Sequence, residues 1–114
     1  MNITKEQIQQ KGYAILEAFE IDSYYKNIDP IVDNTTVFVT AKTGDHEEEG
    51  WEFTVRAPHW QFVNDQGLYV ISFLEDGTPH RFYDFTGGTT LPLFLHQTTS
   101  GAYETYLSIE EVPD

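Results

Sequence analysis

The chain has 114 residues, with 19 acidic against 6 basic side chains, no cysteine and a formal charge of −13. Six scattered bases cannot form a basic stripe, so direct binding to nucleic acid or to an anionic membrane surface is not expected. Nucleophilic cysteine chemistry is excluded. The length suits a single globular domain, residues 1–114, that needs neither a disulfide nor a metal to fold.

The sequence also gives an expectation for the cellular compartment. No apolar run approaches the roughly 18 residues that a membrane-spanning helix needs. The first residues lack the basic stretch and apolar core of a signal peptide. Together with the lack of cysteine, these features lead us to expect a cytoplasmic protein.

The first predicted element is an amphipathic helix near residues 5–20. Thr4 is followed three residues later by Gln7, which is the pattern of a capping box. The apolar positions recur at helical spacing: Ile8, Gly12, Ile15, Leu16 and Phe19. A glycine inside a helix costs about 1 kcal/mol relative to alanine. We therefore expect Gly12 to allow close approach of the helix to a flat surface such as a sheet.

The rest of the chain is predicted to be mainly β-structure. Alternating or wholly apolar runs predict strands at residues 37–42, 51–57, 68–74, 78–85 and 103–109. Residues 22–34 are interpreted as a connector, and residues 44–50 as a hairpin loop. Residues 68–74 are apolar on both faces, which is typical of a central strand. Residues 91–96 fit either a strand or a single helical turn.

These elements predict an α+β fold, with one N-terminal amphipathic helix packed on a curled antiparallel sheet of five to seven strands. The sheet is expected to be a meander or a partial barrel. The 8 Phe, 2 Trp and 7 Tyr are too many for one helix to cover. The second face of the sheet is therefore expected to curl into a barrel, to form a cleft, or to pack on another molecule, a homodimer included.

The acidic residues form partial clusters, the densest around His46. Such a cluster at a hairpin tip is either a solvated end that discourages aggregation or a contact patch for a basic partner. The predicted partner-binding residues are Asp45, Glu47, Glu48, Glu49, Trp60, Glu75, Asp76 and Glu104. Close mimicry of DNA would require the acids to concentrate on about a quarter of the surface, because the average charge density is several-fold too low.

Metal and catalytic motifs are lacking. The four histidines show no metal-ligand spacing, and we expect no metal and no cofactor. On a regular strand His80, Phe82 and Asp84 would share one face, so His80 and Asp84 could form an acid–base pair or a polar rim. An enzyme that uses this pair is the least favoured of three hypotheses.

The leading hypothesis is a non-enzymatic acidic binding protein that inhibits a basic partner, one that itself handles nucleic acid. Toxin-immunity proteins and phage anti-defence inhibitors share this composition, which is a likeness of composition only. The alternative is a small-molecule or carbohydrate-binding domain with an aromatic-lined pocket on the sheet.

Overall fold

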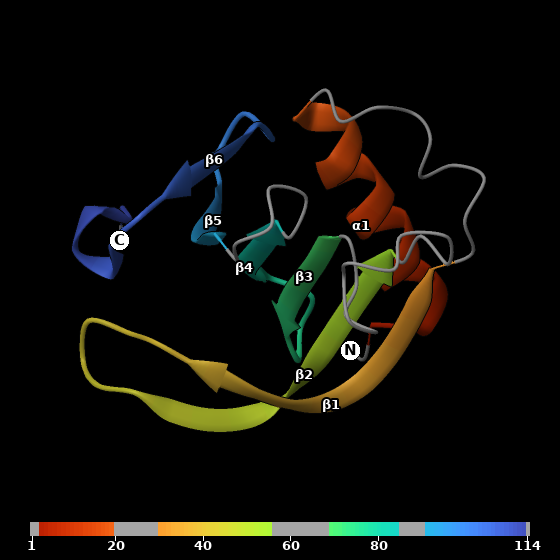
Figure 1. Cartoon of the computed structure of the whole chain (residues 1–114), viewed down its shortest axis with the longest axis horizontal. Helices are drawn as coiled ribbons and strands as arrows, with labels where there is room; N and C mark the ends of the chain where they lie inside the picture. The colour runs from red at the N-terminus through yellow and green to blue at the C-terminus, as the bar shows by residue number, and fades with distance from the viewer. Residues whose placement is uncertain (1–2, 20–29, 56–68, 85–90, 114) are drawn as a thin grey trace.

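A computed structural model describes residues 3–19, 30–55, 69–84 and 91–113 (Figure 1). The elements in chain order are α1 (Lys5–Ala18), β1 (Ile31–Val39), β2 (His46–Val55), β3 (Tyr69–Leu74), β4 (Pro79–Asp84), β5 (Leu91–Gln97), β6 (Tyr103–Tyr106) and η3 (Ile109–Glu111). The six strands form one antiparallel meander in the order β1-β2-β3-β4-β5-β6. The sheet is curled and not closed, and α1 packs on one of its faces, which confirms the predicted α+β fold.

The predicted capping box starts α1. The Gln7 backbone N–H donates to Thr4 Oγ1 at 3.2 Å, and the Thr4 backbone N–H donates to Gln7 Oε1 at 2.8 Å. These two bonds satisfy donors that the first helical turn would otherwise leave free. The predicted apolar stripe is buried, with Ile8, Ile15 and Leu16 at 0% exposure.

Gly12 brings the helix close to the sheet, as expected. A Cβ atom at Gly12 would lie only 2.5 Å from Cδ2 of Phe53 on β2. The Phe53 ring therefore occupies the space that any other residue at this position would fill. Tyr13 packs edge-on against the same ring, with 5.5 Å between the ring centroids. The glycine thus lowers the helix propensity of α1 but allows close contact with Phe53, one of the two fully buried phenylalanines of the core.

The strand register places the main core in a single row across five strands. Its members pair in succession from β1 to β5: Val32, Phe53, Ile71, Phe82 and Leu93. These side chains belong to the apolar cluster that also contains the helix stripe. We call this side of the sheet the helix-covered face, and the other side the opposite face. The central position predicted for β3 is confirmed.

The burial pattern of β1 changes sides along the strand. Val32 is buried on the helix-covered face, whereas Val37 and Val39, at odd spacing from it, are buried on the opposite face. Figure 1 shows β1 curving along its length. Gly50 on β2 permits this curvature, because a Cβ there would collide with the Val37 side chain and the Phe73 carbonyl oxygen.

The β1–β2 hairpin corrects two sequence-based expectations. Strand β1 begins at Ile31, inside the segment interpreted as a connector. Strand β2 begins at His46, so most of the expected loop 44–50 is strand. The acidic residues there pair with β1, Glu47 with Phe38 and Glu49 with Thr36. Pairing with β1 satisfies the backbone hydrogen bonds of these residues, while their charged side chains remain in solvent. A run of charged residues in the sequence therefore cannot distinguish such a strand from a loop.

The C-terminal part brings two further results. The ambiguous residues 91–96 belong to strand β5, which pairs with β4 and β6. Strand β6 ends at Tyr106, earlier than the predicted 103–109. The chain leaves the sheet there because the Ser108 side chain accepts from the Glu110 backbone N–H at 3.2 Å and starts η3.

Candidate functional site

The opposite face is partly closed by the end of the curled β1 strand. The Thr40 backbone N–H donates to Nε2 of His80 at 3.3 Å, and Thr40 Oγ1 accepts from Arg81 at 3.1 Å. The Arg81 guanidinium carbon lies 4.1 Å from the centre of the Phe94 ring, and His80 contacts the edge of that ring. These contacts join residues about 40 positions apart and hold the hairpin end against β4 and β5.

His80 is a structural residue in this arrangement. The β3–β4 register shifts between Ser72 and Phe73, so that His80 is the extra residue of a β-bulge. The expectation that His80 shares one face with Phe82 and Asp84 is therefore wrong: Phe82 packs under α1, while His80 faces Thr40 and Phe94. Burial lowers the pKa of His80, and the charge of Arg81 lowers it further. The neutral ring accepts the Thr40 bond through Nε2 and carries its proton on Nδ1.

A cavity of about 320 Å³ opens on the opposite face. Its apolar lining comes from Val37, Phe38, Val70 and Tyr83, and its polar lining from Thr36, Glu52 and Ser72. We call this cavity the acidic hollow, because Glu52 is its charged residue. Phe38 is 58% exposed, the highest exposure of any large apolar side chain on the strands that the structure describes.

Two carboxylates face each other beside the acidic hollow. Glu52 on β2 pairs directly with Asp33 on β1. Burial raises the pKa of Glu52, and the charge of Asp33 raises it further. Like charges directly opposite one another across two strands destabilise a sheet. Arg81 lies in the same row of the sheet, two strands away, but its guanidinium stacks on Phe94 instead.

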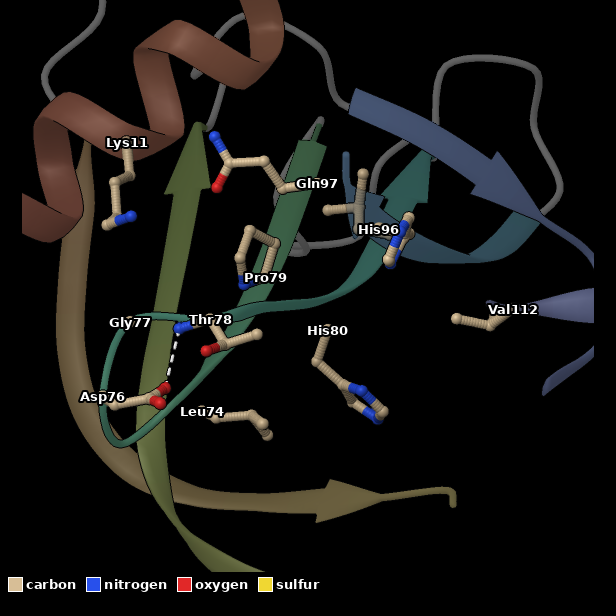
Figure 2. A pocket seen from close by; sticks show the side chains of 11 residues that line it. Lys11, Leu74, Asp76, Gly77, Thr78, Pro79, His80, His96, Gln97 and Val112 are labelled. Carbon is tan, nitrogen blue, oxygen red and sulfur yellow. Dashed lines mark hydrogen bonds between the residues drawn. The ribbon is translucent and has the colours of Figure 1, made fainter. Parts of the chain in front are cut away.

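A second cavity, of about 410 Å³, lies between α1, the β3–β4 turn and β5 (Figure 2). Its polar lining comes from Lys11, Asp76, Thr78, His80, His96 and Gln97. The Asp76 side chain accepts from the Thr78 backbone N–H at 2.9 Å. A hydrogen bond from the Thr78 side chain lowers the pKa of Asp76, and the backbone bond lowers it further. Donors, acceptors and both signs of charge are mixed around this cavity, so its lining favours no single class of ligand. The described part of the chain holds no group of three or more side chains able to bind a metal ion.

The predicted partner-binding residues are only partly brought together. Glu47 and Glu49 share one side of β2, and Glu48 lies on the other. Gly50 pairs with Leu74, which places Glu49 next to Glu75 at the edge of the β3–β4 turn. Glu104 is on β6, at the far edge of the sheet, and therefore lies apart from these residues.

The other predicted contact residues have different surroundings. Asp45 is exposed in the loop before β2. Asp76 is engaged in its own turn, so its side chain is less available to a partner than that of Glu75. Trp60 lies outside the described residues.

Few counter-charges accompany these acids. Nε2 of His46 lies 2.9 Å from Oε2 of Glu48, and among the described residues no other ion pair involves Asp45 or residues 47–49. Two of the cations bind elsewhere within the chain: Arg81 contacts Thr40 and Phe94, and Lys42 donates to the Val112 carbonyl. Within the part of the chain that the structure describes, the exposed carboxylates of the hairpin are therefore largely uncompensated.

Three residues at or beside the acidic hollow were not among the predicted site residues: Asp33, Glu52 and Tyr83. Asp33 falls in the segment interpreted as a connector, and Glu52 falls in the predicted strand 51–57. Only the β1–β2 register brings the two carboxylates together. The alternation of β2 did carry one usable signal, because it placed Glu52 on the face opposite Phe53.

Comparison with protein families, curated proteins and solved structures found no match to this chain. Among the described residues, no helix is both long enough and apolar enough to cross a membrane. The class of protein thus follows from the fold alone: an α+β protein with one helix on a curled antiparallel meander.

Proposed function

We propose that this chain is a non-enzymatic binding protein that occupies a basic partner protein in the cytoplasm. The observation that carries the proposal is the set of exposed acids on the β1–β2 hairpin that lack a lysine or arginine partner among the described residues. A partner that handles nucleic acid is the natural target, because its binding surface is basic. In this role the chain would act as an inhibitor of the immunity or anti-defence type.

The electrostatics favour association with a cationic surface. A chain with a charge of −13 speeds its encounter with a basic protein and repels nucleic acid and other copies of itself. The repulsion between copies makes a homodimer less favourable than a complex with a basic partner. Sedimentation at low and at high salt measures this directly, and a dimer at low salt would favour the homodimer instead.

The proposal can be tested with two double variants of equal charge. The full chain is used to capture partners from a lysate of the cells that make it, and the captured protein is then purified for affinity measurements. We expect a basic partner whose affinity falls steeply with salt. Glu47→Lys with Glu49→Lys should weaken binding about tenfold or more, whereas Glu6→Lys with Glu17→Lys on α1 should weaken it much less.

Three results would count against the proposal. They are the capture of no basic protein, an affinity that does not depend on salt, and an equal loss of binding in the two double variants. Equal loss would mean that only the total charge matters and that the hairpin has no special part.

A second candidate function is a small-molecule or carbohydrate-binding domain. The acidic hollow supports it, since its volume is at the lower end of the range of about 300–1,000 Å³ for ligand sites. Its lining includes Phe38 and Tyr83 but is otherwise aliphatic or polar, which suits a cation better than a neutral sugar. Thermal shifts measured with a panel of neutral sugars discriminate the two functions, because only the second candidate predicts stabilisation by an uncharged ligand.

A further inference from the structure

The acidic hollow combines a carboxylate with apolar walls and lacks a cation. Glu52 contributes the charge, while Val37 and Val70 contribute aliphatic surface. Neither lysine nor arginine lines the hollow among the described residues. The nearest arginine in the sheet row, Arg81, is held on Phe94 and Thr40 instead.

The charge arrangement is unfavourable for the isolated chain. Asp33 and Glu52 face each other across two strands, and burial raises the pKa of Glu52 in addition to the effect of Asp33. A cation placed in the hollow would offset both costs, because it attracts the two carboxylates and replaces lost solvation. Perturbed carboxylates that line a cavity are common at binding sites.

We propose that the acidic hollow binds the side chain of a lysine or arginine that the basic partner presents. This inference rests on the proposed function and names the contact that the partner makes. The aliphatic stem packs on Val37 and Val70, and the charged head pairs with Glu52. Tyr83 also lines the hollow, and its ring offers the head a further cation–π contact.

The hollow can be tested without knowing the partner. The full chain is titrated with Nα-acetyl-lysine N-methylamide, and NMR signals of Val70 and Tyr83 are followed. The matching norleucine compound has the same four-carbon stem without the charge. We expect saturable shifts with the lysine compound and none with the norleucine compound. Shifts of equal size with both compounds, or no shifts with either, would overturn the inference.

A matched pair of variants tests the role of Glu52. Glu52→Gln keeps the size of the side chain and removes one negative charge from the hollow. Glu17→Gln removes one charge from the exposed side of α1, away from the hollow. We expect E52Q to weaken binding of the lysine compound about tenfold and E17Q to leave it within about twofold. Equal weakening by the two variants would contradict a specific role for Glu52.

The same variants separate this inference from the proposed function. If E52Q binds the purified partner as well as the wild type does, while the Glu47 and Glu49 double variant does not, the hollow is not the contact and the proposed function stands. If no basic partner exists, the proposed function fails. The proposal that a partner's lysine or arginine side chain occupies the hollow then fails as well. A free amine such as cadaverine then shows whether the hollow binds small cations instead.

Discussion

The two faces of the sheet are built from neighbouring residues and differ in composition. On the helix-covered face, Val32 pairs with Phe53 in a row of buried apolar side chains. One residue along the same strands, on the opposite face, Asp33 pairs with Glu52 in a row that carries charge. The apolar row is buried and stabilises the fold. The charged row contains two facing carboxylates whose repulsion does not stabilise the fold. A feature of this kind calls for a functional explanation.

The largest expected effect compares two phenylalanines. Phe53→Ala empties the centre of the helix-covered face, where the ring is fully buried, and should lower the free energy of unfolding by about 3–5 kcal/mol. Phe38→Ala, on a side chain that is mostly exposed, should change it by no more than about 0.5 kcal/mol. Urea denaturation measures both values. Similar losses in the two variants would mean that the exposed Phe38 side chain also contributes to the core.

Gly12→Ala is expected to destabilise the protein although alanine favours helices. The new Cβ would lie 2.5 Å from the Phe53 ring, so α1 or the ring must shift, at a cost of about 1–3 kcal/mol. Gln10→Ala, at an exposed position of the same helix, should be neutral or slightly stabilising. A G12A variant that melts above the wild type would show that α1 does not pack tightly on β2.

His80→Ala should weaken the attachment of the hairpin end to the opposite face. The Thr40 backbone N–H loses its acceptor, which costs about 1 kcal/mol at neutral pH. The matched variant His96→Ala, on a partly exposed histidine, should have a smaller effect. Equal losses would indicate that the Thr40 contact contributes nothing to stability.

The same histidine predicts a dependence of stability on pH. Because burial lowers the pKa of His80, the folded state favours the neutral ring. This contribution is complete above the ordinary value of 6.5 and is lost as the pH falls through the lowered pKa of the folded protein. Thermal melts from pH 8 to pH 5 should show a decline that is shallower in H80A. Parallel curves for the two proteins would contradict the assignment.

Glu52→Gln has the smallest expected effect on stability, and its sign is opposite to that of the others. Removing one of two facing carboxylates should raise the free energy of unfolding at pH 7 by about 0.2–1 kcal/mol. The pKa of Glu52 is raised in the folded protein, so the penalty is present when the residue is ionised and disappears below its ordinary value of 4.5. The gain should therefore vanish in acid. Glu47→Gln, on an exposed acid, is the control and should change little.

The sequence was sufficient to predict the elements whose local pattern agrees with their packing. The capping box, the apolar stripe of α1 and the close approach at Gly12 depend on residues near each other in the chain, and the structure confirms them. The start of β1 and the strand character of Glu47 were missed because pairing with a distant segment decides both. The bulge at His80 was missed for the same reason, and it takes His80 off the face of Phe82, on which the sequence allowed an acid–base pair or a polar rim with Asp84.

The candidate site was less predictable than the fold. The facing carboxylates lie 19 positions apart in sequence, on two strands whose register no local pattern reveals. Four of the predicted contact acids form a run around His46, and Glu75 lies next to Glu49 of that run, whereas Glu104 lies at the far edge of the sheet. Charge density in a sequence therefore indicates the sign of a partner but does not locate its contact.

The most direct measurement determines stability and binding on the same sample of the E52Q variant. If the facing carboxylates of the opposite face serve binding rather than folding, E52Q should melt at a higher temperature than the wild type at pH 7 and bind Nα-acetyl-lysine N-methylamide about tenfold more weakly. Opposite changes in the two quantities would support the separation of roles between the faces. A variant that loses stability and binding together, or changes neither, would contradict it.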